Sequence, residues 1–310
     1  MHFFHFFMPQ NFSIYTALNS YKYLILISYV NVKKYDVFTF KKLKSGGEME
    51  KEIIVYDRFS CSNCADENSL DFDFTMAFQP IINCQTQQVY GYEALVRGLN
   101  NESAYSIISK VNDDNRYLFD QLCRVKAISL AAQLKLDSIL SINFLPKAIY
   151  KPERCIRTTL EAADKYGFPT NKIMFEFTEV EKFEDVSIVK NILEYYSKLG
   201  FITAIDDFGS GYAGLGLLAN FQTNIAKFDM DLIRNIEQDK TRQSIIRNCL
   251  NMFRELNITP LAEGIETVEE MNWLKEAGIE LMQGYLFARP GFESLPKVDF
   301  SIFDHAKNIE

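Results

Sequence analysis

Short apolar runs rich in β-branched residues alternate with longer stretches of helical periodicity through most of this chain. From residue 139 onward, successive runs begin 23 to 34 residues apart, which predicts strand–helix–strand units and a parallel sheet. Two earlier runs, Phe78–Ile82 and Val89–Arg97, are joined by a short polar turn and predict an antiparallel pair. We expect the other strands at residues 139–144, 173–177, 201–205, 225–228, 258–262 and 281–287.

Eight strands in about 220 residues fit a closed (β/α) barrel better than a doubly wound sheet. No glycine-rich dinucleotide fingerprint follows any of the expected strands, which weakens the doubly wound alternative. Helical periodicity predicts the intervening helices, some of which stop at a glycine, at residues 117–134, 153–166, 186–199, 241–256 and 268–277.

Composition narrows the kinds of function that fit this chain. With 310 residues and 47% hydrophobic content, it can build one large α/β domain or two smaller ones. The net charge of -8 argues against a non-specific nucleic-acid binder. The three histidines, His2, His5 and His305, lie near the termini, which argues against a histidine triad or a histidine-rich metal cluster in the central region.

The first 73 residues differ from the rest in pattern. The apolar stretch Tyr21–Val32 is shorter than the roughly 20 residues that span a bilayer, and no small-residue cleavage site follows it, so we expect neither an anchor nor a signal peptide. The run Ser45–Glu48 before Met49 is what a ribosome-binding site would encode if it were read through in frame. We therefore hypothesise that translation starts at Met49 and that residues 1–48 are an extension, untranslated or disordered.

The domain boundaries follow from these patterns. Residues 49–73 are expected to form a short leader with a Cys61-x-x-Cys64 pair, 74–300 the main folded domain, and 301–310 a C-terminal tail. A second CxxC that could complete a zinc ribbon does not occur, so we favour reduced cytosolic thiols over a redox or metal role.

The stretch from Ile202 to Gly216 places two adjacent acids, Asp206 and Asp207, between a strand-like run and a glycine-rich segment. Neighbouring carboxylates repel unless a cation or a shared proton compensates them. Glycines allow the backbone conformations of a mobile loop over a site. The stretch is consistent with a divalent metal site or, more simply, with a solvated acidic turn.

The surrounding strands favour the metal site. The carboxyl ends of parallel strands meet at one face of a (β/α) barrel, and this is where its active sites lie. The polar residues at or near these expected ends are Asn143, Glu176, Asp206, Lys227, Glu263 and Gln283. Glu93, on the preceding hairpin strand, would join them. A single polar strand end is commonplace, but a set at one level predicts a functional cluster.

The residue types in this set narrow its chemistry. Carboxylates and a carboxamide, without histidine or thiolate, form an oxygen site suited to Mg²⁺ or Mn²⁺, and the excess of acids indicates two ions. Such ion pairs are typical of enzymes that hydrolyse phosphate esters. Lys227 would orient the water or offset transition-state charge, or else form a structural ion pair with Asp229 or a neighbouring acid.

The motifs, taken in order, resemble those of the EAL-domain cyclic di-GMP phosphodiesterases. They extend from about Phe74 to Pro290 and comprise Glu93-Ala-Leu-x-Arg97, Asn143, Glu176-Phe-Thr-Glu179, Asp206-Asp-Phe-Gly, Lys227-Phe-Asp229, Glu263-Gly-Ile-Glu266 and Gln283-Gly-Tyr. The resemblance implies a TIM-like (β/α)8 barrel with one antiparallel strand. It also implies Mg²⁺- or Mn²⁺-dependent hydrolysis of cyclic di-GMP to linear pGpG.

The same resemblance assigns roles by position. The first ion would be bound by Glu93, Asn143, Glu176 and Asp206, and the second by Asp207. Lys227 and Glu263 would position and deprotonate the attacking water, with Glu93 as a further catalytic residue, and Glu179 would hold the loop that follows Asp207. The dinucleotide would contact Gln79, Leu95, Arg97 and Gln283, with Arg97 on a phosphate. Phe177 and Phe228 replace more usual aliphatic residues, and we expect both to face the barrel wall.

Two other functions stay open from the sequence. One is a receptor or interaction module that binds cyclic di-GMP or a protein without turnover, and the other is a barrel hydrolase for a different phosphodiester. The complete acid and lysine set favours the enzyme. We further expect a cytoplasmic protein that forms a homodimer and contacts neither a membrane nor a nucleic-acid polymer.

Overall fold

The computed structural model describes the strands within residues 12–57 and then residues 70–145, 148–149, 152–178, 186–211 and 214–305. The chain forms two compact units, Met1–Glu67 and Asn68–Glu310. The sequence-based assignments to Cys61, Cys64 and Glu179 lie outside the described residues.

The first unit contains a four-stranded antiparallel sheet in which strand order follows chain order. Its strands are β1 (Phe12–Asn19), β2 (Tyr23–Val32), β3 (Tyr35–Leu43) and β4 (Met49–Asp57). The sheet crosses the expected boundary at Met49, and the translation start at this residue stays a prediction.

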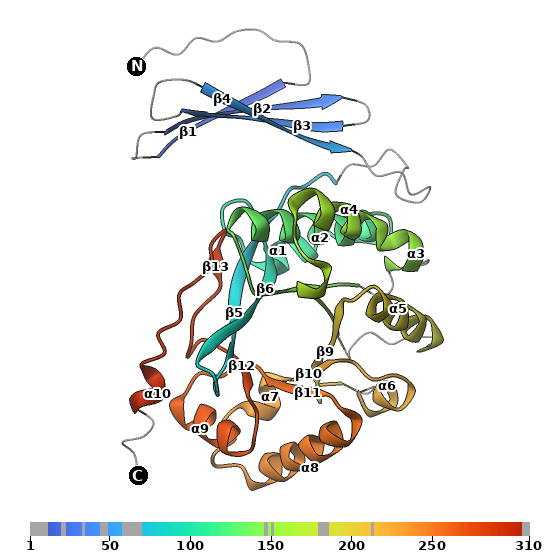
Figure 1. Ribbon diagram of the computed structural model, residues 1–310, viewed down its shortest axis with the longest axis vertical. Coiled ribbons are helices and arrows are strands. Elements are labelled where there is room, and N and C mark those ends of the chain that lie inside the picture. The colour runs from blue at the N-terminus through green and yellow to red at the C-terminus, as the bar shows by residue number, and fades with distance from the viewer. Residues whose placement is uncertain are drawn as a thin grey trace. The chain divides into compact units, whose positions relative to one another are not determined.

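The second unit is a closed eight-stranded barrel, as the sequence predicted (Figure 1). Its strands are β5 (Thr75–Asn83), β6 (Gln88–Arg97), β7 (Ile139–Asn143), β8 (Ile173–Thr178), β9 (Ile202–Phe208), β10 (Ile225–Phe228), β11 (Thr259–Ala262) and β12 (Leu281–Gln283). β5 runs antiparallel to both of its neighbours in the barrel, β6 and β12, and its pairing with β12 closes the ring. The other neighbouring pairs are parallel. A short strand, β13 (Gly291–Phe292), adds to the edge of β5.

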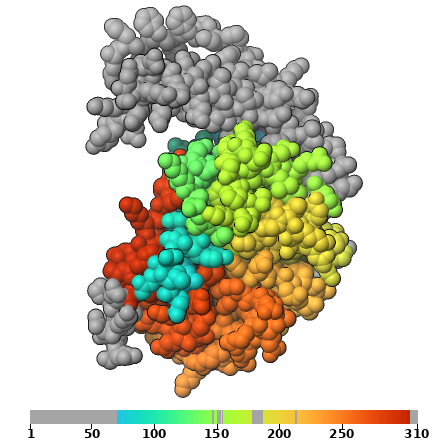
Figure 2. All heavy atoms as spheres, in the orientation of Figure 1, coloured from blue at the N-terminus to red at the C-terminus, as the bar shows by residue number. Residues whose placement is uncertain are grey.

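Helices cover the outside of this barrel, and the segments follow one another around the ring in chain order (Figures 1 and 2). They are α1 (Ala104–Ile108), α2 (Arg116–Gln133), α3 (Pro152–Cys155), α4 (Arg157–Tyr166), α5 (Val186–Lys198), α6 (Gly214–Asn220), α7 (Met230–Ile233), α8 (Lys240–Leu256), α9 (Val268–Glu276) and α10 (Ile302–His305). None of the helices within the described residues is long and apolar enough to span a bilayer.

Two sequence-based boundaries are wrong. The single helix expected at 153–166 is two helices, α3 and α4, with Ile156 between them. The strand expected at 281–287 ends at Gln283, because the chain then turns so that the Phe287 amide donates to the Gly284 carbonyl at 3.1 Å. A side chain at position 284 would collide with the backbone of Ile265, so glycine permits this close approach.

Apolar side chains fill both sides of the barrel wall. One buried cluster takes residues from strands all around the barrel: Ile81, Met174, Ala204, Ile225, Leu261 and Leu281. Phe177 contacts the ring of Phe144, and Phe228 contacts that of Phe253 on α8. Both phenylalanines are fully buried in the wall, as predicted.

Candidate active site

The polar residues predicted from the strand ends do meet at one end of the barrel. Strand register pairs Asn143 with Glu176 and Gln79 with Glu93, so these side chains lie at the same level. The members of the set are buried or nearly so, although each carries a charge or an amide group. Burying polar groups is costly unless they are paired, and the contacts below show how this set is paired.

Lys227 lies at the centre of the set. Its side chain is fully buried, and Nζ lies 2.6 Å from Glu176 Oε2, 2.6 Å from Glu263 Oε1 and 3.0 Å from Asp206 Oδ1. Glu93 Oε2 is 3.8 Å away. The nearby acids raise the pKa of Lys227 well above its usual value, although burial acts in the opposite direction. Lys227 therefore connects acidic side chains from several strands through ion pairs.

Asp229, which the sequence offered as a structural partner for Lys227, has another position. Its side chain accepts the backbone N–H of Asp231 at 2.8 Å and so caps the short helix α7. The alternative of an ion pair with a neighbouring acid agrees with the contacts of Lys227, and these acids are themselves members of the predicted site.

Glu93 is held by two carboxamides. Asn143 Nδ2 donates to Glu93 Oε1 at 2.7 Å, and Gln283 Nε2 donates to Glu93 Oε2 at 2.8 Å. Gln283 also lies 3.4 Å from Gln79 Oε1, and Gln79 Nε2 donates to the carbonyl of Ala288 at 3.2 Å. These contacts connect the predicted metal ligands Glu93 and Asn143 to the predicted substrate contacts Gln79 and Gln283.

Asp206 and Asp207 lie together because the strand is irregular at this point. In a regular strand, adjacent side chains face opposite sides of the sheet. Here Asp207 has a φ of +54°, and the pairing of β9 with β10 shifts register between Ala226 and Phe228. As a result, one carboxylate oxygen each from Asp206, Asp207 and Glu263 lie within 4.8 Å of one another.

This donor set fits a divalent cation. It offers oxygen ligands only, and its negative charge exceeds the single positive charge of Lys227. Asp206 Oδ1 is buried and lies 3.0 Å from Lys227 Nζ as an ion pair that does not have the geometry of a hydrogen bond, and this one ammonium group is shared with Glu176 and Glu263. Glu263, which the sequence placed beside the attacking water, is in this structure also close enough to Asp206 and Asp207 to bind an ion with them.

Burial is the main cause of raised pKa values among these acids, and neighbouring negative charge adds to it. Burial, opposed by Lys227, raises the pKa of Glu176 to about 8. Burial and the neighbouring Asp206 and Asp229 raise the pKa of Asp207 to about 6. Burial, followed by the charge of Asp206, raises the pKa of Glu263 well above its usual value. A bound cation would favour the ionised form of each of these acids.

Two predicted substrate residues lie outside this network. Arg97, at the end of β6, donates through Nη1 to the carbonyl of Val96 at 2.7 Å, and Leu95 is partly exposed on the same strand. Ser141 was not among the predicted residues, but it is fully buried and its hydroxyl donates to Glu176 Oε1. Since Ser141 is two residues before Asn143 on one strand, the period-two alternation would have placed both on the same face.

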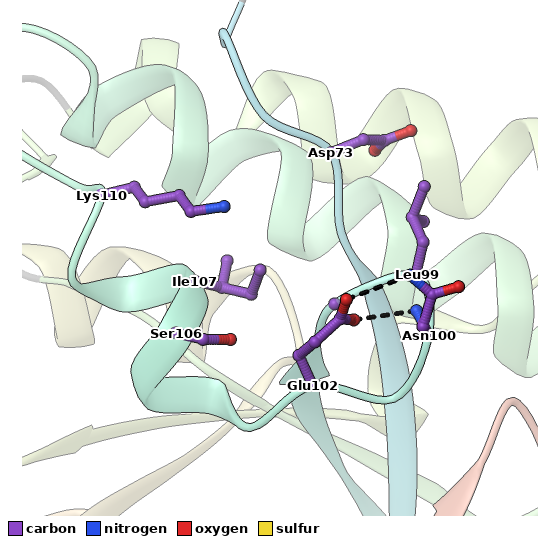
Figure 3. Close-up of a pocket in the computed structure, with 8 residues that line it drawn as sticks. Asp73, Leu99, Asn100, Glu102, Ser106, Ile107 and Lys110 are labelled. Atoms are coloured by element: carbon purple, nitrogen blue, oxygen red, sulfur yellow. Dashed lines mark hydrogen bonds between the residues drawn. The ribbon is translucent and has the colours of Figure 1, made fainter.

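A separate pocket of about 300 Å³ borders the loop after Arg97 (Figure 3). Asp73, Glu102 and Lys110 are among its lining residues. Glu102 is occupied within its own loop, because it accepts from the backbone N–H of Asn100 at 2.8 Å and from its side chain at 3.1 Å. None of the predicted site residues lines this pocket.

The chain matches one known family and resembles several solved structures. The family model described as the EAL domain matches residues 67–290. The chain is similar to a standalone versatile EAL protein from Vibrio cholerae O395, whose crystal structure is of a c-di-GMP-bound form. The identity is 71% and the TM-score 0.74, over 76% of this chain and 99% of that one. This chain also resembles Klebsiella pneumoniae BlrP1, whose structure is of a manganese and cyclic di-GMP complex. The identity is 32% and the TM-score 0.70, over 76% of this chain and 60% of that one.

Two Escherichia coli K12 proteins are similar over most of this chain. The blue light- and temperature-regulated antirepressor BluF is 30% identical over 237 residues, which are 76% of this chain and 58% of BluF. The probable cyclic di-GMP phosphodiesterase PdeN is 27% identical over 242 residues, which are 73% of this chain and 44% of PdeN. The chain thus spans about half the length of these curated relatives.

Proposed function

The chain belongs to the EAL domain family, and from this premise we propose that it is a metal-dependent phosphodiesterase that hydrolyses cyclic di-GMP to linear pGpG. One observation carries the proposal: the buried lysine Lys227 contacts Glu263 and Asp206 at the barrel end where Asp206, Asp207 and Glu263 form an oxygen-only cluster. A bacterial second messenger would be removed by this reaction.

The ions would be held by the residues that the sequence assigned. Glu93, Asn143, Glu176 and Asp206 would hold the first Mg²⁺ or Mn²⁺, and Asp207 would contribute to a second. When bound, such ions lower the pKa of a coordinated water and stabilise negative charge on the phosphate oxygens. The manganese complex of BlrP1 supports the choice of ion.

The protein's own groups would supply the remaining chemistry. Glu263, whose pKa is raised by burial and the charge of Asp206, would accept the proton of the attacking water. Lys227 would keep Glu263 oriented through their 2.6 Å contact and would offset negative charge developing on the phosphate. Glu93, fixed by Asn143 and Gln283, would keep its position during turnover.

Recognition of the dinucleotide would involve the rim of the same barrel end. Arg97 would exchange its bond to the Val96 carbonyl for one to a phosphate, since a guanidinium binds phosphate more strongly than a neutral carbonyl. Leu95 would offer apolar surface, and Gln79 and Gln283 would border the substrate beside Glu93. Glu179 would hold the loop after Asp207.

A receptor without turnover is the second candidate function. It is favoured by the similarity to BluF, which is described as an antirepressor rather than a hydrolase. The position of Glu263 against Lys227 weighs against it, because binding alone requires no water-activating set. Formation of a homodimer and location in the cytoplasm are further parts of our proposal.

The test is hydrolysis of cyclic di-GMP by the full chain with Mg²⁺ or Mn²⁺, followed by chromatographic separation of pGpG. We expect product formation that stops with EDTA and in Glu93→Ala. Glu102→Ala is the matched control, since this glutamate lies outside the cluster and is held by its own loop. Tight binding of cyclic di-GMP without product would reject the enzyme in favour of the receptor.

A further inference from the structure

A buried ion pair connects helix α2 to the outer side of strands β7 and β8. Asp120 and Arg124 lie one turn apart on α2, with side chains 1% and 0% exposed, and Arg124 Nη2 is 2.6 Å from Asp120 Oδ2. Arg124 Nη1 also donates to the hydroxyl of Tyr196 on α5 at 3.1 Å. Removing two charges from water costs about as much as their attraction returns, so net stability does not account for such a pair. Its contacts indicate another role.

Asp120 fixes the backbone just after Asn143. The last bond of this part of the sheet joins the Phe144 amide to the Glu176 carbonyl at 2.9 Å. The next amide, that of Leu145, has left the sheet and donates to Asp120 Oδ1 at 2.9 Å. Asp120 therefore supplies the acceptor that holds the chain two residues beyond a predicted metal ligand.

Arg124 supports the same region and the neighbouring strand. Its guanidinium lies 5.7 Å from the ring centroid of Phe144 and 5.1 Å from that of Phe175. Because side chains alternate along a strand, Phe144 and Phe175 face outward where Asn143 and Glu176 face the site. One buried guanidinium thus contacts the immediate neighbours of two predicted ligands.

We propose that Asp120 and Arg124 are positioning residues that fix Asn143 and Glu176 in the geometry required to bind a divalent ion. The inference rests on the proposed function for the identity of the ligands, but not on turnover. Groups that support metal ligands without touching the ion typically change metal affinity by about 10–100-fold when removed. We expect a loss in this range for Asp120→Ala.

The experiment measures Mn²⁺ affinity by electron paramagnetic resonance on the full chain, without cyclic di-GMP. Asp120→Asn, which keeps an oxygen acceptor for Leu145, should lose less affinity than Asp120→Ala. Tyr196→Phe removes only the hydroxyl to which Arg124 donates, and a smaller loss than in Asp120→Ala is expected. Leu274→Ala on α9 is the control, because it creates a cavity in a fully buried position on another side of the barrel.

Hydrogen exchange gives a readout that needs no metal. The Leu145 amide should exchange slowly in the wild type and rapidly in Asp120→Ala. In Leu274→Ala this amide should still exchange no faster than global unfolding of that variant allows. Absence of Mn²⁺ binding in the wild type would reject the proposed metal site itself. Wild-type binding with unchanged affinity in folded Asp120→Ala would overturn the positioning role.

If Asp120→Ala does not fold, the decision rests on the two conservative variants. Wild-type Mn²⁺ affinity in both Asp120→Asn and Tyr196→Phe would overturn the proposal. Weaker affinity in either, with the Leu274→Ala control unchanged, would support it.

Discussion

Replacing Lys227 with methionine removes the cation that lies among the buried acids while nearly preserving side-chain length. Glu176 and Glu263 each lose a partner at 2.6 Å, and Asp206 loses one at 3.0 Å. Breaking a buried ion pair from one side costs about 3–5 kcal/mol, because the remaining charge is left without compensation. For a domain of this size, each kcal/mol lowers Tm by about 2–4 °C, so metal-free Lys227→Met should melt about 6–20 °C below the wild type.

The loss should depend on pH in a definite direction. Burial, only partly opposed by Lys227, raises the pKa of Glu176 to about 8. Below this pH the folded protein already carries a proton on Glu176, so removal of the lysine costs less. When folding raises the pKa of a group, the folded protein becomes more stable relative to the unfolded chain as pH falls toward the unfolded pKa. The difference in Tm should therefore be largest above pH 8 and smaller at pH 6.

Calorimetry or circular dichroism melting at several pH values, with and without Mn²⁺, measures this effect. Bound Mn²⁺ should restore part of the stability, because it replaces the missing positive charge. Lys172→Met is the matched control, since its 2.6 Å pair with Asp137 involves an aspartate that is 97% exposed. Exposed pairs contribute about 0–1 kcal/mol. Equal, small Tm losses in both variants, independent of pH and of Mn²⁺, would refute the electrostatic account.

Three further predictions concern the same barrel end. Glu93→Gln should keep the fold and lower the rate of cyclic di-GMP hydrolysis by about 100-fold or more, measured as pGpG formation; a wild-type rate would exclude Glu93 from the chemistry. Because burial raises the pKa of Asp207 to about 6, protons on this acid should compete with Mn²⁺ below pH 6, in addition to the competition expected at Glu176, whose pKa is about 8; titration calorimetry should show a smaller fall in affinity below pH 6 for Asp207→Asn than for the wild type, and an identical profile would contradict this. Gly209→Ala should destabilise the protein by about 1–3 kcal/mol in urea unfolding, because φ at this position is +99° and the new Cβ would lie 2.3 Å from Leu232. Surface substitutions usually change the free energy of unfolding by no more than about 0.5 kcal/mol, so a change within that range would show that the loop relaxes freely.

The barrel could be predicted because its signals are local and repeated. Each parallel strand is a short apolar run, several helices end at a glycine, and the spacing of the runs leaves room for one helix between strands. The error at 281–287 arose because Leu286 and Phe287 continue the apolar pattern, while the turn there depends on contact between Gly284 and Ile265. A contact between distant parts of the chain leaves no periodic signal.

The members of the site were also legible from their positions at strand ends. Their specific pairing was left open: Lys227 was expected either to act on water or to pair with Asp229 or a neighbouring acid, and the structure shows it as the partner of Glu176 and Glu263. The support from Asp120 was invisible for the same reason, because its acceptor role joins residues 25 positions apart.

The order of apolar and polar residues along this chain therefore determined the fold class and the end of the barrel at which the acids gather. Only the tertiary structure decided which carboxylate oxygens lie close together, which acids have raised pKa values, and how Asp207 turns toward Asp206 instead of away from it. The physical reason is the separation along the chain of the residues that set each property. Side-chain periodicity is set by neighbouring residues, whereas charge pairing and desolvation depend on distances between strands that are fixed only when the barrel closes.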